Sequence, residues 1–222
     1  NTHNGTILAD GTLALGSATA LGAGSLSVTA AASLANVSGA DLTVANNARL
    51  YLSGDLTYAT SANGLNLGSG QVTVTGDRAI NAAGTLTFGG NLVGVGSLTK
   101  SGAGNLVLAG TNALAGGLTV NAGTVTLGTA TSAGTGAVTI NAGTLGFATG
   151  LTAANVATLT TAAGANLALT NAGTTGVALT VGAGRLAGAL TGAGSLIKVG
   201  TGTLDRKSTR LNSSHANISY AV

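Results

Sequence analysis

Aliphatic and polar side chains alternate in short runs along most of the chain. In TVTL, residues 124–127, and in LTV, residues 118–120, every second residue is aliphatic and the others are threonine. This period of two places one set of side chains inside and the other outside a β-strand, and β-branched residues favour strands over helices. Gly, Asn-Ala-Gly or Gly-Ala-Gly bounds each run and suits a corner. The pattern predicts short strands; residues 151–161 are the best helical candidate, weakened by their threonine content.

The runs recur with a period of about twenty residues, the kind of spacing that marks a repeat architecture. NAGTVTL from Asn121 returns as NAGTLGF from Asn141, and GVGSLTKSGAGNL from Gly94 returns as GAGSLIKVGTGTL from Gly192. Short strands with tight corners at this period predict an all-β fold, a right-handed parallel β-helix (β-solenoid) with about 20 residues per coil. Residues 1–204 would then form roughly ten coils stacked about 4.8 Å apart. The alternative is a Gly/Ala-rich fibrous polymer, which the lack of strict G-x-y or poly-Ala periods disfavours.

The alternation also predicts which side chains form the core. Three threonines between the aliphatic positions, Thr119, Thr124 and Thr126, are expected to face outward. The residues expected in buried rows are Leu98, Leu106, Leu108, Leu118, Val120, Val125, Leu127, Val138, Ile140, Leu145 and Phe147.

The composition excludes several classes of protein. The chain has 222 residues with 38 Gly, no Cys and 6% charged residues, and its mean hydropathy of +0.49 argues against disorder of the charged kind. Gly, Asn and Thr interrupt every apolar run, so no transmembrane helix is expected. The first residues lack the basic start and apolar run of a signal peptide, so we expect a fragment or a mature segment. Without Cys there is no Cys-based zinc or redox site.

The last eighteen residues, DRKSTRLNSSHANISYAV, differ from the rest. Residues 205–215 resemble the in-frame translation of a common short-read sequencing adapter, residues 216–217 stand where its sample index lies, and residues 218–222 match its continuation. We therefore expect residues 205–222 to be an artefactual or disordered tail and residues 1–204 to be the solenoid. An open solenoid end can still pair with any strand. Without the tail the chain has five basic and four acidic residues, which removes the charge argument for nucleic-acid binding.

Few residues could carry chemistry. Asp55 and Asp77 could stack on neighbouring coils as a pair of carboxylates, but no base, metal set or sugar platform accompanies them. Lys100 and Lys198 hold equivalent strand-end places in two repeat copies, which favours a structural charge that discourages edge pairing. His3 is a lone terminal histidine. No catalytic, cofactor-binding or metal-binding residue is predicted, no cofactor is expected, and the chain is not expected to be an enzyme.

The repeat resembles a known family. GVGSLTKSGAGNLVLAGTNALAGGLTVNAGTVTLG, residues 94–128, is similar to the autotransporter-associated β-strand repeat of Gram-negative passenger domains. Leu114-Ala115 departs from that pattern, in which an aromatic residue often precedes the Gly-Gly pair. The second copy stops at residue 204. The resemblance implies a passenger that is secreted or displayed on the cell surface, anchored at the outer membrane. Its partner would be the C-terminal outer-membrane β-barrel of the same full-length chain, of which these residues show no sign.

Two functions from different classes remain. The first is a structural stalk that aids its own export as its coils stack outside the cell. The second is an adhesin that binds a host or neighbouring-cell surface ligand; its binding patch would break the Thr/Gly/Asn monotony, and the least monotonous stretch is residues 41–58, which contains Tyr51. The isolated aromatic residues are otherwise interpreted as core or corner packing. A polysaccharide-active β-helix enzyme is a disfavoured third alternative.

Overall fold

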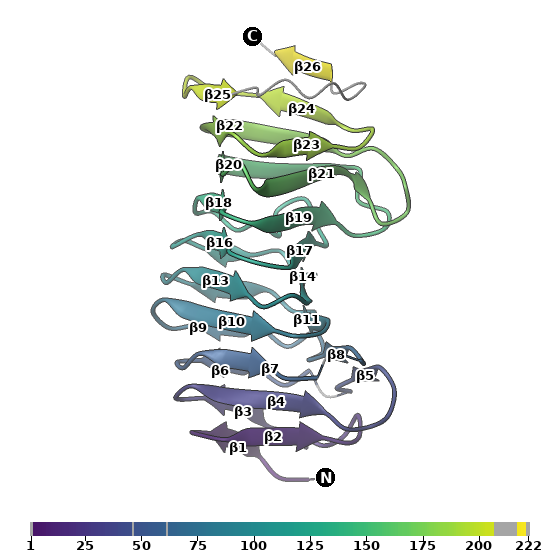
Figure 1. Cartoon of the computed structure of the whole chain (residues 1–222). Helices are drawn as coiled ribbons and strands as arrows, with labels where there is room; N and C mark the ends of the chain where they lie inside the picture. Colours follow the sequence, from purple (N-terminus) through teal and green to yellow (C-terminus); the bar gives the residue numbers. More distant parts are fainter. Residues whose placement is uncertain (1, 46, 61, 207–216, 221–222) are drawn as a thin grey trace.

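The computed structural model describes residues 2–45, 47–60, 62–206 and 217–220, the last four by their backbone only. Within these ranges the structure contains strands and no helix. The strands stack in parallel as a β-solenoid of about ten turns with about 21 residues per turn, with β1 and β2 at one end and β24 and β26 at the other (Figure 1). The predicted all-β parallel solenoid is confirmed. Most of the helical candidate at residues 151–161 instead forms the long strand β20 (Ala153–Thr161).

The strands of the coils form three parallel sheets, here called sheets A, B and C. Sheet A runs in the order β1 (Gly5–Leu8), β3 (Ser25–Val28), β6 (Leu50–Leu52), β9 (Val72–Val74), β12 (Leu92–Gly94) and β15 (Ala113–Leu114). Sheet C runs in the order β23 (Ala189–Thr191), β21 (Ala165–Asn171), β19 (Gly143–Phe147), β17 (Thr124–Leu127), β14 (Asn105–Leu108), β11 (Leu86–Phe88), β8 (Leu65–Asn66) and β5 (Leu42–Thr43).

Sheet B runs the length of the solenoid. Its order is β2 (Thr12–Leu15), β4 (Ala32–Asn36), β7 (Leu56–Tyr58), β10 (Arg78–Ala82), β13 (Leu98–Ser101), β16 (Leu118–Val120), β18 (Val138–Ile140), β20 (Ala153–Thr161), β22 (Ala178–Leu186), β24 (Ser195–Lys198) and β26 (Asn217–Tyr220), and β25 (Leu204–Arg206) also pairs with β22.

The register keeps like positions in line from coil to coil. In sheet B, Ile80 pairs with Lys100, Lys100 with Val120, and Val120 with Ile140, so one coil here takes 20 residues. Leu56 lies on the coil before Ile80 and pairs with it, so the coil between these two residues is longer. The repeat seen in the sequence therefore corresponds to one turn of the solenoid, and a side chain meets the equivalent side chain of its neighbours.

The core consists of stacked rows of aliphatic side chains between the sheets. Thr119, Thr124 and Thr126 are half-buried on the outer faces of their strands. The predicted register is confirmed. The residues predicted to be inside are all buried: Leu98, Leu106, Leu108, Leu118, Val120, Val125, Leu127, Val138, Ile140, Leu145 and Phe147.

Stacked glycines allow the coils to pass close to one another at the corners. A Cβ atom on Gly96 would lie 1.8 Å from the backbone oxygen of Gly76, and one on Gly90 would lie 1.9 Å from that of Gly70. Real Cβ atoms essentially never approach closer than 3.0 Å. A side chain at either position would push two coils apart, so close approach of backbones explains part of the high glycine content.

The predicted tail is only partly described by the structure. Residues 207–216 and 221–222 lie outside the described residues. The backbone of β25 pairs with β22, and that of β26 pairs with β24, with Asn217 beside Ser195. Pairing of this kind is expected at any open solenoid end, so the adapter origin of residues 205–222 stays a prediction.

Candidate functional site

Acidic and amide side chains at the corners link each coil to the next. In each case a side-chain oxygen accepts a hydrogen bond from a backbone N–H located 20 to 24 residues further along the chain. Because these N–H groups need an acceptor, the side chains serve the stacking of the coils. The pairs are Gly64 N to Asp41 Oδ1 at 2.6 Å, Ala79 N to Asp55 Oδ1 at 2.8 Å, Ser97 N to Asp77 Oδ1 at 2.8 Å and Thr111 N to Asn91 Oδ1 at 3.0 Å.

The two candidate carboxylates, Asp55 and Asp77, have separate partners. Asp55 lies 3.9 Å from a guanidinium nitrogen of Arg78, in a partly exposed ion pair. Asp77 accepts hydrogen bonds from both the backbone N–H and the hydroxyl of Ser97, and these bonds lower the pKa of Asp77. A general acid needs a raised pKa, so Asp77 is poorly suited to donate a proton. The arrangement favours a structural role for both residues.

Lys100 lies inside the solenoid. It occupies the core row between Ile80 and Val120 and is 0% exposed. The ammonium Nζ donates to the backbone oxygens of Ser101 at 2.6 Å and Gly102 at 2.8 Å, and a third bond reaches the next coil. Burial lowers its pKa to about 8. The interpretation of Lys100 as a strand-end charge that discourages edge pairing was wrong, because its strand is paired on both sides.

The ammonium of Lys100 is bound by carbonyls of the corner that follows it. This corner connects Ser101, the last residue of β13, to Asn105, the first residue of β14. Lys198 repeats the arrangement, donating to the oxygens of Val199 at 2.7 Å and Gly200 at 2.8 Å, but its side chain is only half-buried. Both lysines are therefore corner-filling residues.

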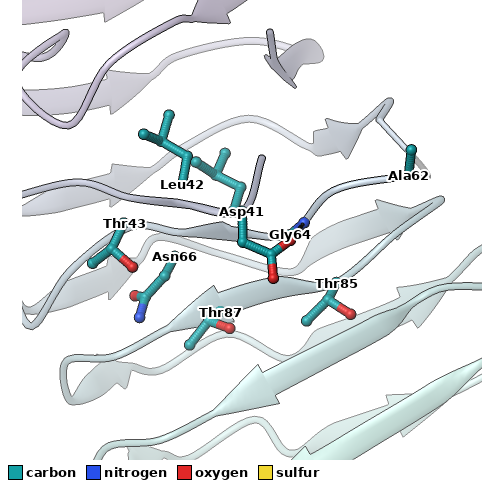
Figure 2. Close-up of a pocket in the computed structure, with 9 residues that line it drawn as sticks. Asp41, Leu42, Thr43, Ala62, Gly64, Asn66, Thr85 and Thr87 are labelled. Atoms are coloured by element: carbon teal, nitrogen blue, oxygen red, sulfur yellow. Dashed lines mark hydrogen bonds between the residues drawn. The ribbon is translucent and has the colours of Figure 1, made fainter. Parts of the chain in front are cut away.

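A shallow polar hollow of about 310 Å³ lies on the outer face of sheet C. Asp41 and Thr85 lie on either side of Gly64, which has no side chain, so the surface dips between them (Figure 2). Thr43, Asn66 and Thr87 form the neighbouring row along β5, β8 and β11.

The hollow offers little for catalysis. Asp41 is the one carboxylate in its lining, and no cation or second acid joins it there. The carboxylate also already accepts the Gly64 N–H. A hydrolytic site would need a second acid or a base within reach, which the lining of this hollow does not provide.

The aromatic side chains of residues 2–206 divide into two groups. Tyr58, Phe88 and Phe147 are buried in the core, as expected, and the hydroxyl of Tyr58 donates to the backbone oxygen of Asn63. Burial raises the pKa of Tyr58. Tyr51 instead points outward from β6, since Leu50 and Leu52 on either side of it are buried. The expectation of core or corner packing therefore fails for Tyr51, which lies within a strand and faces outward.

Two further observations concern the described residues as a whole. No group of three or more His, Asp or Glu side chains in residues 2–206 could hold a metal ion. No helix there is long and apolar enough to cross a membrane. His3, near the start, shares a 2.8 Å hydrogen bond with the hydroxyl of Thr6.

Comparison with known proteins identifies the central repeat. Residues 98–127 and 122–146 match the passenger-associated-transport-repeat family. No curated protein and no solved structure matches the chain. The two matches lie where β13 to β19 form successive coils.

Proposed function

Because the transport repeat and the β-solenoid together fit an autotransporter passenger domain with repeats, we propose that this chain is a non-catalytic stalk within such a passenger. The passenger would be secreted or displayed on the surface of a Gram-negative bacterium. Its partner would be an outer-membrane β-barrel in the same full-length chain. Stacking of coils outside the cell would help to draw the chain outward.

The observation that supports this proposal is that polar side chains form hydrogen bonds between neighbouring coils. Asp41, Asp55 and Asp77 each hold the backbone of the following coil, and Lys100 holds two coils from within. A coil that docks thus completes hydrogen bonds and buries a new row of aliphatic side chains. Each step releases free energy only after the segment is outside, which favours outward movement.

Export of the full-length protein tests the proposal. Deleting residues 178–204, the last coils before the tail, should reduce surface display on intact cells, measured by antibody binding and by protease accessibility. A deletion of similar length in the first coils, residues 5–31, is the matched control and should reduce display less. Unchanged display after the first deletion would refute the export role.

A second function is favoured by one specific observation. Tyr51 stands outward on sheet A within the least monotonous part of the sequence, where an adhesin would place its ligand-binding patch. Saturable binding of the purified chain to cells or matrix proteins that is lost in Tyr51→Ala would support adhesion. Binding that Tyr51→Ala leaves intact would argue against this face.

A further inference from the structure

The outer face of sheet A presents an aromatic side chain and a cation side by side. Burial alternates through residues 49–52: Arg49 is exposed, Leu50 buried, Tyr51 half-buried and Leu52 buried. The sheet ladder extends to Arg49, because its backbone oxygen accepts from Leu26 N at 2.9 Å. Arg49 and Tyr51 are separated by two positions on one face of the strand, so their Cβ atoms are about 7 Å apart. One molecule of modest size can therefore contact both.

Arg49 differs from the other cations of the described residues up to 204. Arg78 and Arg185 each form an ion pair. Lys100 and Lys198 donate to backbone carbonyls. Arg49 makes no side-chain hydrogen bond or ion pair with any described residue. A planar guanidinium that is free to bind is suited to a carboxylate or sulfate.

The immediate neighbours of Tyr51 on the outer face of sheet A are polar. Ser27 and Thr73 pair with it from the coils on either side, and Ser53 and Gln71 are exposed nearby. A protein partner would need a contiguous apolar core to its interface, which these hydroxyl and amide side chains do not provide. A sugar ring has an apolar face that can lie on an aromatic ring and hydroxyls that can bond to the Ser and Thr floor.

We propose that Arg49 and Tyr51 on the outer face of sheet A form a binding site for an acidic saccharide. Tyr51 provides the platform for a sugar ring, and Arg49 binds the carboxylate or sulfate on that ring or its neighbour. The site is separate from the stalk role and supplies a ligand class for adhesion. The saccharide-site proposal can therefore be refuted without affecting the export proposal, and the export proposal can be refuted without affecting the saccharide site.

Titration calorimetry with the purified chain tests the site. The probes are oligogalacturonate, hyaluronate and heparin oligosaccharides, the methyl ester of oligogalacturonate as a neutral match, and polyglutamate as an acidic peptide. The chain should bind at least one acidic saccharide. If oligogalacturonate binds, its methyl ester should bind at least tenfold more weakly. Arg49→Gln and Tyr51→Ala should each weaken binding at least tenfold, and Tyr51→Phe, which keeps the ring, less than threefold.

Arg185→Gln is the matched control, because it removes an exposed arginine from sheet B; its affinity should stay within twofold of the wild type. Circular dichroism should show the same melting temperature for all four variants, since every substituted side chain points outward. Absence of binding to every acidic saccharide would overturn the proposal. So would equal binding of polyglutamate, or affinity that neither Arg49→Gln nor Tyr51→Ala changes.

Discussion

Replacing the buried Lys100 with methionine should change how the stability of the solenoid depends on pH. Methionine is unbranched and fills a similar volume, so the variant removes the charge with little change in packing. It also removes three hydrogen bonds to backbone oxygens. That loss shifts stability by a constant amount, whereas the charge contributes a part that varies with pH.

The size of the variable part follows from the pKa of Lys100, which falls from 10.5 to about 8 on folding. At about 1.4 kcal/mol per pKa unit, the charged lysine costs the fold about 3 kcal/mol. Below pH 8 both the folded and unfolded states bind the proton and the full cost is present. Between pH 8 and 10.5 the unfolded state binds more protons, so stability rises with pH and the cost disappears.

The measurement is urea unfolding followed by circular dichroism at pH 7, 8, 9 and 10 for the wild type and Lys100→Met. The wild type should gain about 2 to 3 kcal/mol relative to the variant between pH 7 and pH 10. Lys198→Met controls for the loss of a lysine as such. A constant difference between wild type and Lys100→Met across this range would refute the burial of a charged ammonium.

Five other changes test the fold. Gly96→Ala should destabilise by about 1–3 kcal/mol through overpacking, whereas Gly146→Ala, whose Cβ would meet nothing within 4 Å, should be neutral in the same melting experiment. Leu118→Ala should cost about 2–5 kcal/mol in urea unfolding; a smaller loss would contradict its core position. Asp77→Asn should make stability less sensitive to acid. The pKa of Asp77 is lowered in the folded state, so its carboxylate stabilises the fold at pH values above its unfolded-state pKa, and this stabilisation is lost as the pH falls. Deleting residues 205–222 should change stability by no more than about 0.5 kcal/mol, and a larger loss would show that the tail caps the solenoid.

The alternation of side chains was sufficient to predict the fold and the core. In sheet B, β16 and β18 each have one outward threonine between two inward aliphatics, so a shift of one residue would have buried the threonine. The same alternation also indicates the inward direction of the Lys100 side chain. In Leu98, Thr99 and Lys100 the lysine takes the inward place, whereas its charge was interpreted as a strand-end feature that discourages edge pairing.

The links between coils could not be predicted in the same way. Which N–H group meets Asp55 depends on the length of the intervening coil, and these lengths vary: Asp55 accepts from Ala79, 24 residues on, and Asp77 from Ser97, 20 residues on. The sequence shows that corners contain aspartate but not which backbone group lies opposite. Likewise, glycine marks a corner in sequence, while the contact between Gly96 and Gly76 depends on the register of two coils.

The division between fixed and free positions has a consequence for how such a chain can change. An inward aliphatic or a stacked glycine such as Gly96 touches two neighbouring coils, so a substitution there disturbs three turns at once. An outward position such as Tyr51 contacts mostly small side chains and water. New surface chemistry can therefore be introduced one residue at a time on the outer faces, while the interior varies by gaining or losing whole turns. The same property makes the solenoid a ruler-like support on which engineered groups could be placed at intervals of about 4.8 Å.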